Sequence, residues 1–267
     1  MVPGQTVPPT FVQLAAHEVR WRLLSELARS DLRVRELVAL LGQPQNLISY
    51  HLRLLRSAGL VEARRSSFDG RDSYYHLDLE SCAQALAAAG AALHPALRLL
   101  PTEPAKAAGT TAAETSAVPS VLFMCTGNSA RSPIAEALLR HRVGNRAEVT
   151  SAGSHPKAHL HPDAVRVLRR QYGIDIADQR PRHLDTMTGR PFDYVISLCD
   201  KVREVRRDFD DHSQRLHWSI PDPAAANGDT TARDSCPAFD RAAAEIDTRI
   251  RYLQPVLLPT PHREVQP

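Results

Sequence analysis

The chain has 267 residues, of which 43% are hydrophobic and 24% charged, and its formal net charge is +3. This is the composition of a folded globular protein, and the length allows two domains. No stretch approaches the roughly 20 apolar residues of a membrane span, and the first residues lack the pattern of a secretory signal. The sequence therefore predicts a cytoplasmic protein with no membrane partner.

Four cysteines are present, and no two have the C-x-x-C spacing of a structural zinc site. Four thiols in a chain of this length do not make a disulfide framework. Each is therefore a core residue, a reactive thiol or a soft-metal ligand. The four are Cys82, Cys125, Cys199 and Cys236.

Residues 11–100 predict a mainly helical region. Apolar residues recur at helical spacing from Phe11 to Leu27, which predicts one amphipathic helix. Shorter helices are expected over 34–41 and 44–57, since glycines follow both segments. Three helices are therefore expected before residue 58.

The segments at 60–65 and 73–79 flank a turn-rich stretch and predict a β-hairpin, followed by an alanine-rich helix over about 81–93. Helices followed by a basic hairpin are typical of a winged helix-turn-helix, mostly α with a β-hairpin wing. Polar side chains on the third helix can read base edges, and hairpin arginines can contact phosphates. The alternative is a helical protein-interaction domain. The predicted DNA contacts are Gln45, Asn46, Ser49, Tyr50, Arg53, Arg64, Arg65 and Arg71.

The segment LISYHLRLLRSAGLVEARRSSFDGRDSYYHL resembles the ArsR/SmtB family of metal-responsive repressors. The resemblance covers roughly residues 10–95 and implies a homodimer, built on terminal helices, that binds operator DNA and is released by an effector. Arsenite-sensing members often carry paired thiols in the second helix of the motif, where this chain has Arg33 and Arg35. Cys82 is the one thiol left in this region, and we expect it to be a packing residue. DNA binding is therefore expected, but the usual sensing site is not.

The segment PTEPAKAAGTTAAETSAV, residues 101–118, is rich in small and turn-forming residues and predicts a flexible linker. It separates a predicted DNA-binding domain at residues 1–100 from a second domain at residues 119–258.

Short apolar segments alternate with helical ones after the linker. Such alternation predicts an α/β domain with a parallel sheet. The expected strands are SVLFMC, AEVTSAG and DYVISLCD, and the expected helices are PIAEALLRHRV, HPDAVRVLRRQYG and DRAAAEIDTRIRYLQPVL.

The segment VLFMCTGNSARSP places Cys125 at the end of a strand and Arg131 six positions later, just before a helix. In this C-x5-R arrangement backbone N–H groups, the helix N-terminus and a guanidinium surround the sulfur. They favour the thiolate and bind a tetrahedral oxyanion beside it, so the sequence predicts a nucleophile within an oxyanion site. Ser132 can donate a hydrogen bond to the thiolate. The predicted oxyanion-binding residues are Thr126, Gly127, Asn128, Ser129, Ala130 and Arg131.

Asp222 lies between Pro221 and Pro223 in the segment LHWSIPDPAA. A thiolate that displaces an oxygen needs a proton donor for it. Asp222 is the candidate, and a solvated loop carboxylate is the alternative.

Residues 119–256 resemble the low-molecular-weight protein tyrosine phosphatase fold, through CTGNSARSPIAEALL, the Ser-Ala-Gly at 151–153, GIDI and the late Asp-Pro. The resemblance implies a nucleophile at Cys125, an oxyanion clamp at Arg131, a thiolate partner at Ser132 and a general acid at Asp222. Its members perform phosphotyrosine hydrolysis or arsenate reduction.

Three features favour arsenate reduction. Alanines follow the Asp-Pro, where the phosphatases usually have a tyrosine. The segment HWSIPDPA is similar to the equivalent segment of the arsenate reductases. The segment VISLCD also resembles theirs and places Cys199 where those enzymes carry a resolving thiol. A packing role is the alternative for Cys199. Thioredoxin-linked reductases carry a third thiol at the place of Arg206.

The sequence therefore predicts a fusion of a transcriptional regulator with a thiol-dependent arsenate reductase that binds no metal or cofactor. The expected reductant is a small thiol with a glutaredoxin-like protein, or thioredoxin. Two alternatives stay open: a transcription factor with a non-catalytic oxyanion-sensing domain, and a low-molecular-weight protein tyrosine phosphatase.

Overall fold

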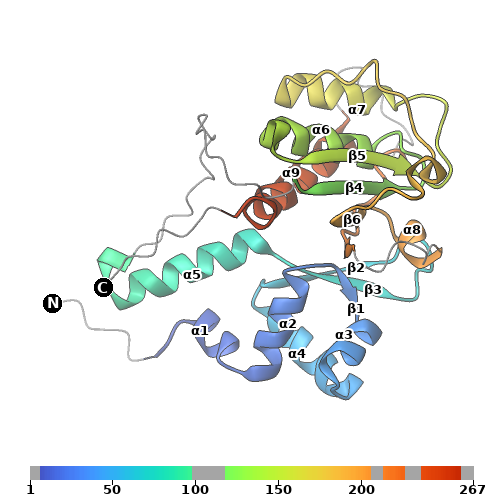
Figure 1. The fold of residues 1–267 in the computed structure, drawn as a ribbon. Helices are drawn as coiled ribbons and strands as arrows, with labels where there is room; N and C mark the ends of the chain where they lie inside the picture. The colour runs from blue at the N-terminus through green and yellow to red at the C-terminus, as the bar shows by residue number, and fades with distance from the viewer. Residues whose placement is uncertain (1–6, 98–117, 206–212, 226–235, 260–267) are drawn as a thin grey trace. The chain divides into compact units, whose positions relative to one another are not determined.

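The computed structural model describes residues 7–97, 118–205, 213–225 and 236–259. The chain divides into two compact units, Met1–Ala105 and Lys106–Pro267, and each is described by itself (Figure 1). The predicted linker at 101–118 lies outside the described residues except for Val118. No helix in the described ranges is both long and apolar enough to cross a membrane.

The first predicted helix is in fact two helices. α1 (Thr10–Ala15) ends before His17, and α2 (Glu18–Leu27) begins after it. The Nδ1 of His17 accepts a hydrogen bond from the backbone N–H of Val19 at 3.2 Å, which caps α2. The prediction of one helix was wrong because the apolar spacing continues across the break, while a histidine cap leaves little signal in a sequence.

The next two helices have the predicted positions. α3 (Val34–Leu41) ends at Gly42, whose φ of 67° is a left-handed conformation that favours glycine. α4 (Gln45–Ser57) follows Pro44 and buries the apolar stripe of Ile48, Leu52 and Leu55.

The predicted hairpin is confirmed, with one strand added. β2 (Val61–Arg65) pairs antiparallel with β3 (Ser73–Leu77). β1 (Leu32–Arg33) pairs with the other edge of β3, and two residues are too few for a periodicity signal. α5 (Leu79–Leu93) and a 3-10 turn at Pro95–Leu97 follow. The helices and this wing confirm the predicted winged helix-turn-helix.

The second unit confirms the predicted parallel sheet. Its four strands have the order β5-β4-β6-β7. The predictions located β4 (Ser120–Cys125), β5 (Glu148–Gly153) and β6 (Tyr194–Ser197) but missed β7 (Gln214–His217). β7 lies at the sheet edge and is buried only at its last residue, so it lacks the apolar run of an inner strand.

Helices connect these strands. α6 (Arg131–Val143), α7 (Pro162–Val167) and α9 (Pro237–Leu257) lie in the predicted segments, whereas α8 (Asp200–Val205) was not predicted. Short turns of helix follow at Leu168–Tyr172, Gly144–Arg146 and Leu184–Met187.

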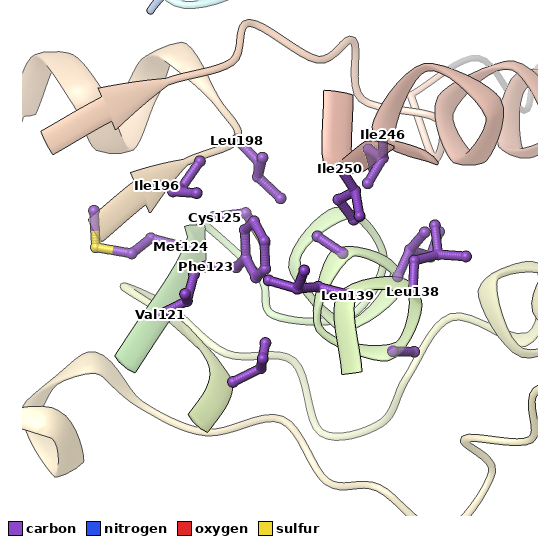
Figure 2. Close-up of a cluster of buried hydrophobic side chains, with 14 of the residues drawn as sticks. Val121, Phe123, Met124, Cys125, Leu138, Leu139, Ile196, Leu198, Ile246 and Ile250 are labelled. Carbon is purple, nitrogen blue, oxygen red and sulfur yellow. The ribbon is translucent and has the colours of Figure 1, made fainter. Parts of the chain in front are cut away.

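The core of this unit lies where β4 and β6 meet α6 and α9 (Figure 2). Phe123 of β4, Leu139 of α6 and Ile250 of α9 are fully buried in it. Cys125, at the end of β4, is part of the same cluster. The core therefore holds the predicted nucleophile in place.

Candidate active site and candidate DNA-binding surface

The candidate active site lies at the carboxyl ends of the parallel strands. Cys125 of β4 is in register with Gly153 of β5, and Met124 is in register with Ser197 of β6. Segments that leave these strands therefore start side by side. The chain passes from Cys125 through the five loop residues 126–130 directly into α6, and all the predicted oxyanion-binding residues lie in this connection or at its end.

Two groups contact the buried sulfur of Cys125. The Oγ of Ser132 lies 3.0 Å from the Sγ. The backbone N–H of Asn128 donates to the same sulfur at 3.2 Å. Asn128 can turn its N–H inward because its φ is 43°, and it is the one described residue other than glycine with a positive φ. A thiolate and an anion beside it would both be stabilised by such donors.

Gly153 supports the loop from the neighbouring strand. A Cβ at this position would lie 2.7 Å from the carbonyl oxygen of Thr126 and 2.8 Å from the backbone nitrogen of Asn128. Any side chain there would displace the loop, so the glycine of the Ser-Ala-Gly segment is required by a close backbone approach.

The side chain of Asn128 belongs to a buried hydrogen-bond network. Its Nδ2 donates to the Oγ of Ser132 and of Ser151, both at 2.9 Å, and its Oδ1 accepts from the backbone N–H of Arg182 at 2.7 Å. Ser151 donates to the buried carboxylate of Glu136 at 2.6 Å, and the guanidinium of Arg182 donates to the same carboxylate. These hydrogen bonds therefore fix the conformation of the loop at residues 126–130.

Sequence reasoning did not assign a role to Glu136, Ser151 or Arg182. Ser151 was noted only within the Ser-Ala-Gly segment. A glutamate among the apolar residues of a helix was the available signal for Glu136, because a buried carboxylate needs partners.

Arg131 and Asp222 are brought together, although 91 positions separate them in the chain. The Nη1 of Arg131 donates to the carbonyl oxygen of Ile220, and the Nη2 donates to the carboxylate of Asp222, each at 3.0 Å. The Arg131 side chain is 7% exposed and that of Asp222 is 45% exposed. The carboxylate is thus held at the rim of the site, where it can exchange protons with water.

Cys199 lies next to the same loop. Its Sγ is 3.3 Å from the Oγ1 of Thr126, and the residue is 2% exposed. Burial raises the pKa of the Cys199 thiol, Arg131 opposes the rise, and Cys125 adds to it. Cys199 is therefore near the nucleophile and protonated at neutral pH.

A second buried network follows Cys199. The Oδ1 of Asp200 accepts a hydrogen bond from Ser219 at 2.8 Å and lies 3.1 Å from the Nε2 of His217. The Nδ1 of His217 lies 2.9 Å from the Oγ of Ser197. These contacts tie the segment that carries Cys199 to the one that leads to Asp222.

The candidate DNA-binding surface lies on the exposed face of α4. The residues Gln45, Asn46, Ser49, Tyr50 and Arg53 are all exposed there. The guanidinium of Arg53 lies 5.7 Å from the centre of the Tyr50 ring, so these two side chains form one cationic and aromatic group. A helix face of this kind can make hydrogen bonds and stacking contacts in a groove.

The three predicted wing arginines differ in exposure. Arg64 is partly buried, whereas Arg65 and Arg71 are exposed. The side chain of Arg71 is 91% exposed, and its nearest carboxylate is that of Asp69, at 3.7 Å. Arg65 and Arg71 are therefore the wing cations that are accessible to a phosphate backbone.

The positions where arsenite sensors often carry thiols hold an ion-pair cluster here. Arg33 pairs with Glu36 at 3.2 Å, and both Arg33 and Arg35 approach the carboxylate of Asp72, at 3.6 and 3.1 Å. Asp72 lies just before β3, so the cluster ties α3 to the wing.

The remaining two cysteines lie away from these sites. Cys82 is buried in the core of the first unit, and burial, with the nearby charge of Asp78, raises the pKa of its thiol to about 11. Cys236 precedes α9 and packs against the core of the second unit. Among the described residues, no three His, Cys, Asp or Glu side chains gather as a metal site would require.

Two family models match separate parts of the chain. The model for low molecular weight phosphotyrosine protein phosphatase matches residues 120–260. The model for bacterial regulatory protein, arsR family, matches residues 17–63. The first match contains the loop after β4, and the second contains α4.

Curated relatives match the second unit. The chain is 37% identical to an arsenate reductase of Shouchella clausii over 134 residues, which are 49% of this chain and 91% of the relative. It is 37% identical to an arsenate reductase of Bacillus licheniformis over 132 residues, with the same coverage. A solved thioredoxin-dependent arsenate reductase of Corynebacterium glutamicum has 25% sequence identity and a TM-score of 0.42, covering 88% of this chain and 96% of that one.

Proposed function

The chain belongs to the low molecular weight phosphotyrosine protein phosphatase family through residues 120–260, and from this premise we propose that it is a thiol-dependent arsenate reductase fused to an ArsR-type transcriptional regulator. The enzymatic part of this proposal rests on the Cys125 sulfur, which is contacted by the Oγ of Ser132 and the backbone N–H of Asn128. Such a site can hold a tetrahedral oxyanion in contact with a nucleophile. The names of the curated relatives favour arsenate as that oxyanion.

In the proposed first step, the Cys125 thiolate attacks arsenate and one arsenate oxygen leaves as water. The backbone N–H groups of the loop and Arg131 bind the remaining oxygens. Asp222 gives the departing oxygen a proton, and its position at the rim lets it regain one from solvent. The step forms a sulfur–arsenic bond and leaves arsenic in its pentavalent state.

In the proposed second step, a thiolate attacks the sulfur of Cys125. A disulfide forms, the sulfur–arsenic bond breaks, and its electron pair stays with arsenic, which leaves as arsenite. Two thiols are oxidised for each arsenate reduced. Cys199 is the intramolecular candidate because it lies beside Thr126 of the same loop.

An external thiol must then restore the enzyme. Arg206 stands where thioredoxin-linked reductases have their third thiol. We therefore propose a small thiol with a glutaredoxin-like protein as the reductant, with thioredoxin as the other candidate. Neither step needs a bound metal or cofactor.

The first unit is proposed to bind operator DNA as a homodimer in the cytoplasm. The exposed polar face of α4 and the accessible wing arginines support DNA binding. Apolar side chains exposed on the terminal helices, such as Val12 of α1 and Leu86 of α5, support pairing of two copies through this unit.

Arsenate turnover by the purified protein tests the enzymatic proposal. The assay would compare a small thiol with glutaredoxin against thioredoxin with its reductase, and would be repeated with Cys125→Ser and Cys199→Ser. We expect turnover that requires Cys125. Failure to reduce arsenate with every reductant, together with rapid hydrolysis of aryl phosphates, would replace this proposal with a phosphatase.

A second candidate function is a regulator whose second unit only senses an oxyanion. The ion pairs of Arg33 and Arg35 with Asp72, where sensors often carry thiols, favour it because the first unit then lacks a thiol-based effector site. DNA binding would be measured with arsenate, phosphate and arsenite. Release by arsenate from a Cys125→Ser protein, which cannot turn over, would support this candidate.

A further inference from the structure

Lys157 lies against the oxyanion loop, in the segment between β5 and α7. Its backbone N–H donates to the carbonyl oxygen of Gly127 at 2.9 Å. On either side of Lys157, the backbone N–H of His155 donates to the carbonyl oxygen of Thr126 and that of His161 donates to the carbonyl oxygen of Ser129, both at 2.8 Å. The backbone of Lys157 is therefore held in a fixed position beside the loop.

The side chain of Lys157 extends along the same loop. A Cβ placed on Gly127 would lie 3.4 Å from the Cγ of Lys157 and 4.0 Å from its Cε. The aliphatic stem thus covers Gly127, and the ammonium is only one bond beyond the Cε. The ammonium of Lys157 therefore lies close to the residues that are predicted to bind the oxyanion.

The charge of Lys157 is not neutralised by the part of the chain that the structure describes. The residue is exposed, and its ammonium makes no ion pair or hydrogen bond there. Arg131, in contrast, already donates to Asp222 and Ile220. Lys157 is thus a second cation at this site beside Arg131, and no described carboxylate offsets its charge toward an incoming anion.

We propose that Lys157 is a substrate-binding residue that captures a small tetrahedral oxyanion at the mouth of the loop and favours it over an aryl phosphoester. The inference rests on the proposed function of the loop. In a free oxyanion, the oxygen that points out of the loop is charged and can interact with an ammonium. In an ester that oxygen carries the organic group, so the same ammonium contributes less.

Oxyanion binding to the full chain without turnover tests the inference. The parent protein carries Cys125→Ser, and the affinities of inorganic phosphate and arsenate are measured by calorimetry at low ionic strength. Lys157→Met keeps the stem over Gly127 but removes the charge, and Lys157→Arg keeps a charge. We expect Lys157→Met to weaken both affinities about fivefold, with the difference shrinking as salt is added. Lys157→Arg should stay within about twofold of the parent.

Arg146→Met is the matched control. Arg146 is exposed and follows the C-terminal end of α6, whereas the loop precedes its N-terminal end, so the two are separated by about 20 Å of helix. This variant should bind both anions as the parent does. In the active enzyme, Lys157→Met should raise KM for arsenate, leave kcat within about twofold, and change KM for an aryl phosphate less.

Two results would overturn the inference while leaving the proposed function intact. Equal affinities for the parent and Lys157→Met, or equal losses in Lys157→Met and Arg146→Met, would show that Lys157 does not contact the anion. If the Cys125→Ser parent binds neither anion, the proposed oxyanion site is itself wrong and the inference fails with it.

Discussion

The two candidate sites are built in opposite ways. The DNA-binding surface uses residues close together in the chain, on one helix and one hairpin, and nearly all of them are exposed. The active site collects residues from segments as distant as Cys125 and Asp222, and its central groups are buried. In the first case the side chains meet an external partner, whereas in the second they meet one another.

This difference determines how much a single substitution should cost. Groups that hold each other in a buried network lose several interactions when one member is removed. Groups on an exposed face each contribute a small and nearly independent part of the binding free energy. Substitutions in the second unit should therefore have larger effects than those in the first.

Cys125→Ser should have the largest effect. It removes the nucleophile, so arsenate reduction should fall by at least about 1,000-fold, to background, in a coupled assay. DNA affinity, measured by fluorescence anisotropy on the same preparation, should not change. If a Cys125→Ser protein still reduced arsenate, another thiol would be the nucleophile, and the contrast between the two candidate sites would no longer hold.

Arg131→Lys should cost about 100-fold in kcat/KM for arsenate, because lysine keeps the charge but loses the planar pair of donors. It should also release Asp222, whose carboxylate now accepts from the Nη2 of Arg131. Steady-state kinetics would measure the loss, and Arg146→Lys, at the far end of α6, is the control. A loss below about fivefold would mean that charge alone is sufficient at this position.

The sequence predicted those parts of the candidate active site that leave a local pattern. The loop from Cys125 to Arg131 is continuous in the chain, and its strand and helix have periodic apolar residues. Glu136, Ser151 and Arg182 were missed because their partners come from separate elements, which only the folded sheet brings together. The position of Lys157 beside this loop could not be predicted either, since nothing in its own segment marks Gly127 as its neighbour.

The same difference between local patterns and contacts across the fold explains which elements of the first unit were predicted. Helices and strands with a repeating apolar pattern were predicted with nearly correct bounds. The break between α1 and α2 and the short β1 were not, because one depends on a single cap and the other on pairing with β3. The cluster of Arg33, Arg35 and Asp72 also depends on that pairing.

The release of arsenite should depend on pH through Cys199. Its raised pKa leaves the thiol protonated near neutrality, so the thiolate fraction should increase about tenfold for each pH unit below that pKa. Single-turnover release without external thiol should accelerate accordingly between about pH 6.5 and 8.5. In Cys199→Ser, a small external thiol should restore arsenite release, and the rate should then no longer follow the ionisation of Cys199. A flat profile in the unmodified protein would exclude Cys199 as the resolving thiol.

The smallest effects are expected on the DNA-binding surface, where Arg53 and Arg71 can be compared directly. Arg53 lies on α4 beside Tyr50, whereas Arg71 is almost fully exposed on the wing. Arg71→Gln should weaken binding to operator and unrelated DNA alike, by about fivefold, and lower the salt slope by about one, as expected for one lost phosphate contact. Arg53→Gln should weaken operator binding more than unrelated binding, because α4 is the element placed to read bases. If both variants lost affinity equally for all sequences, α4 would contact only the backbone, and the first unit would lack the base readout that a regulator needs.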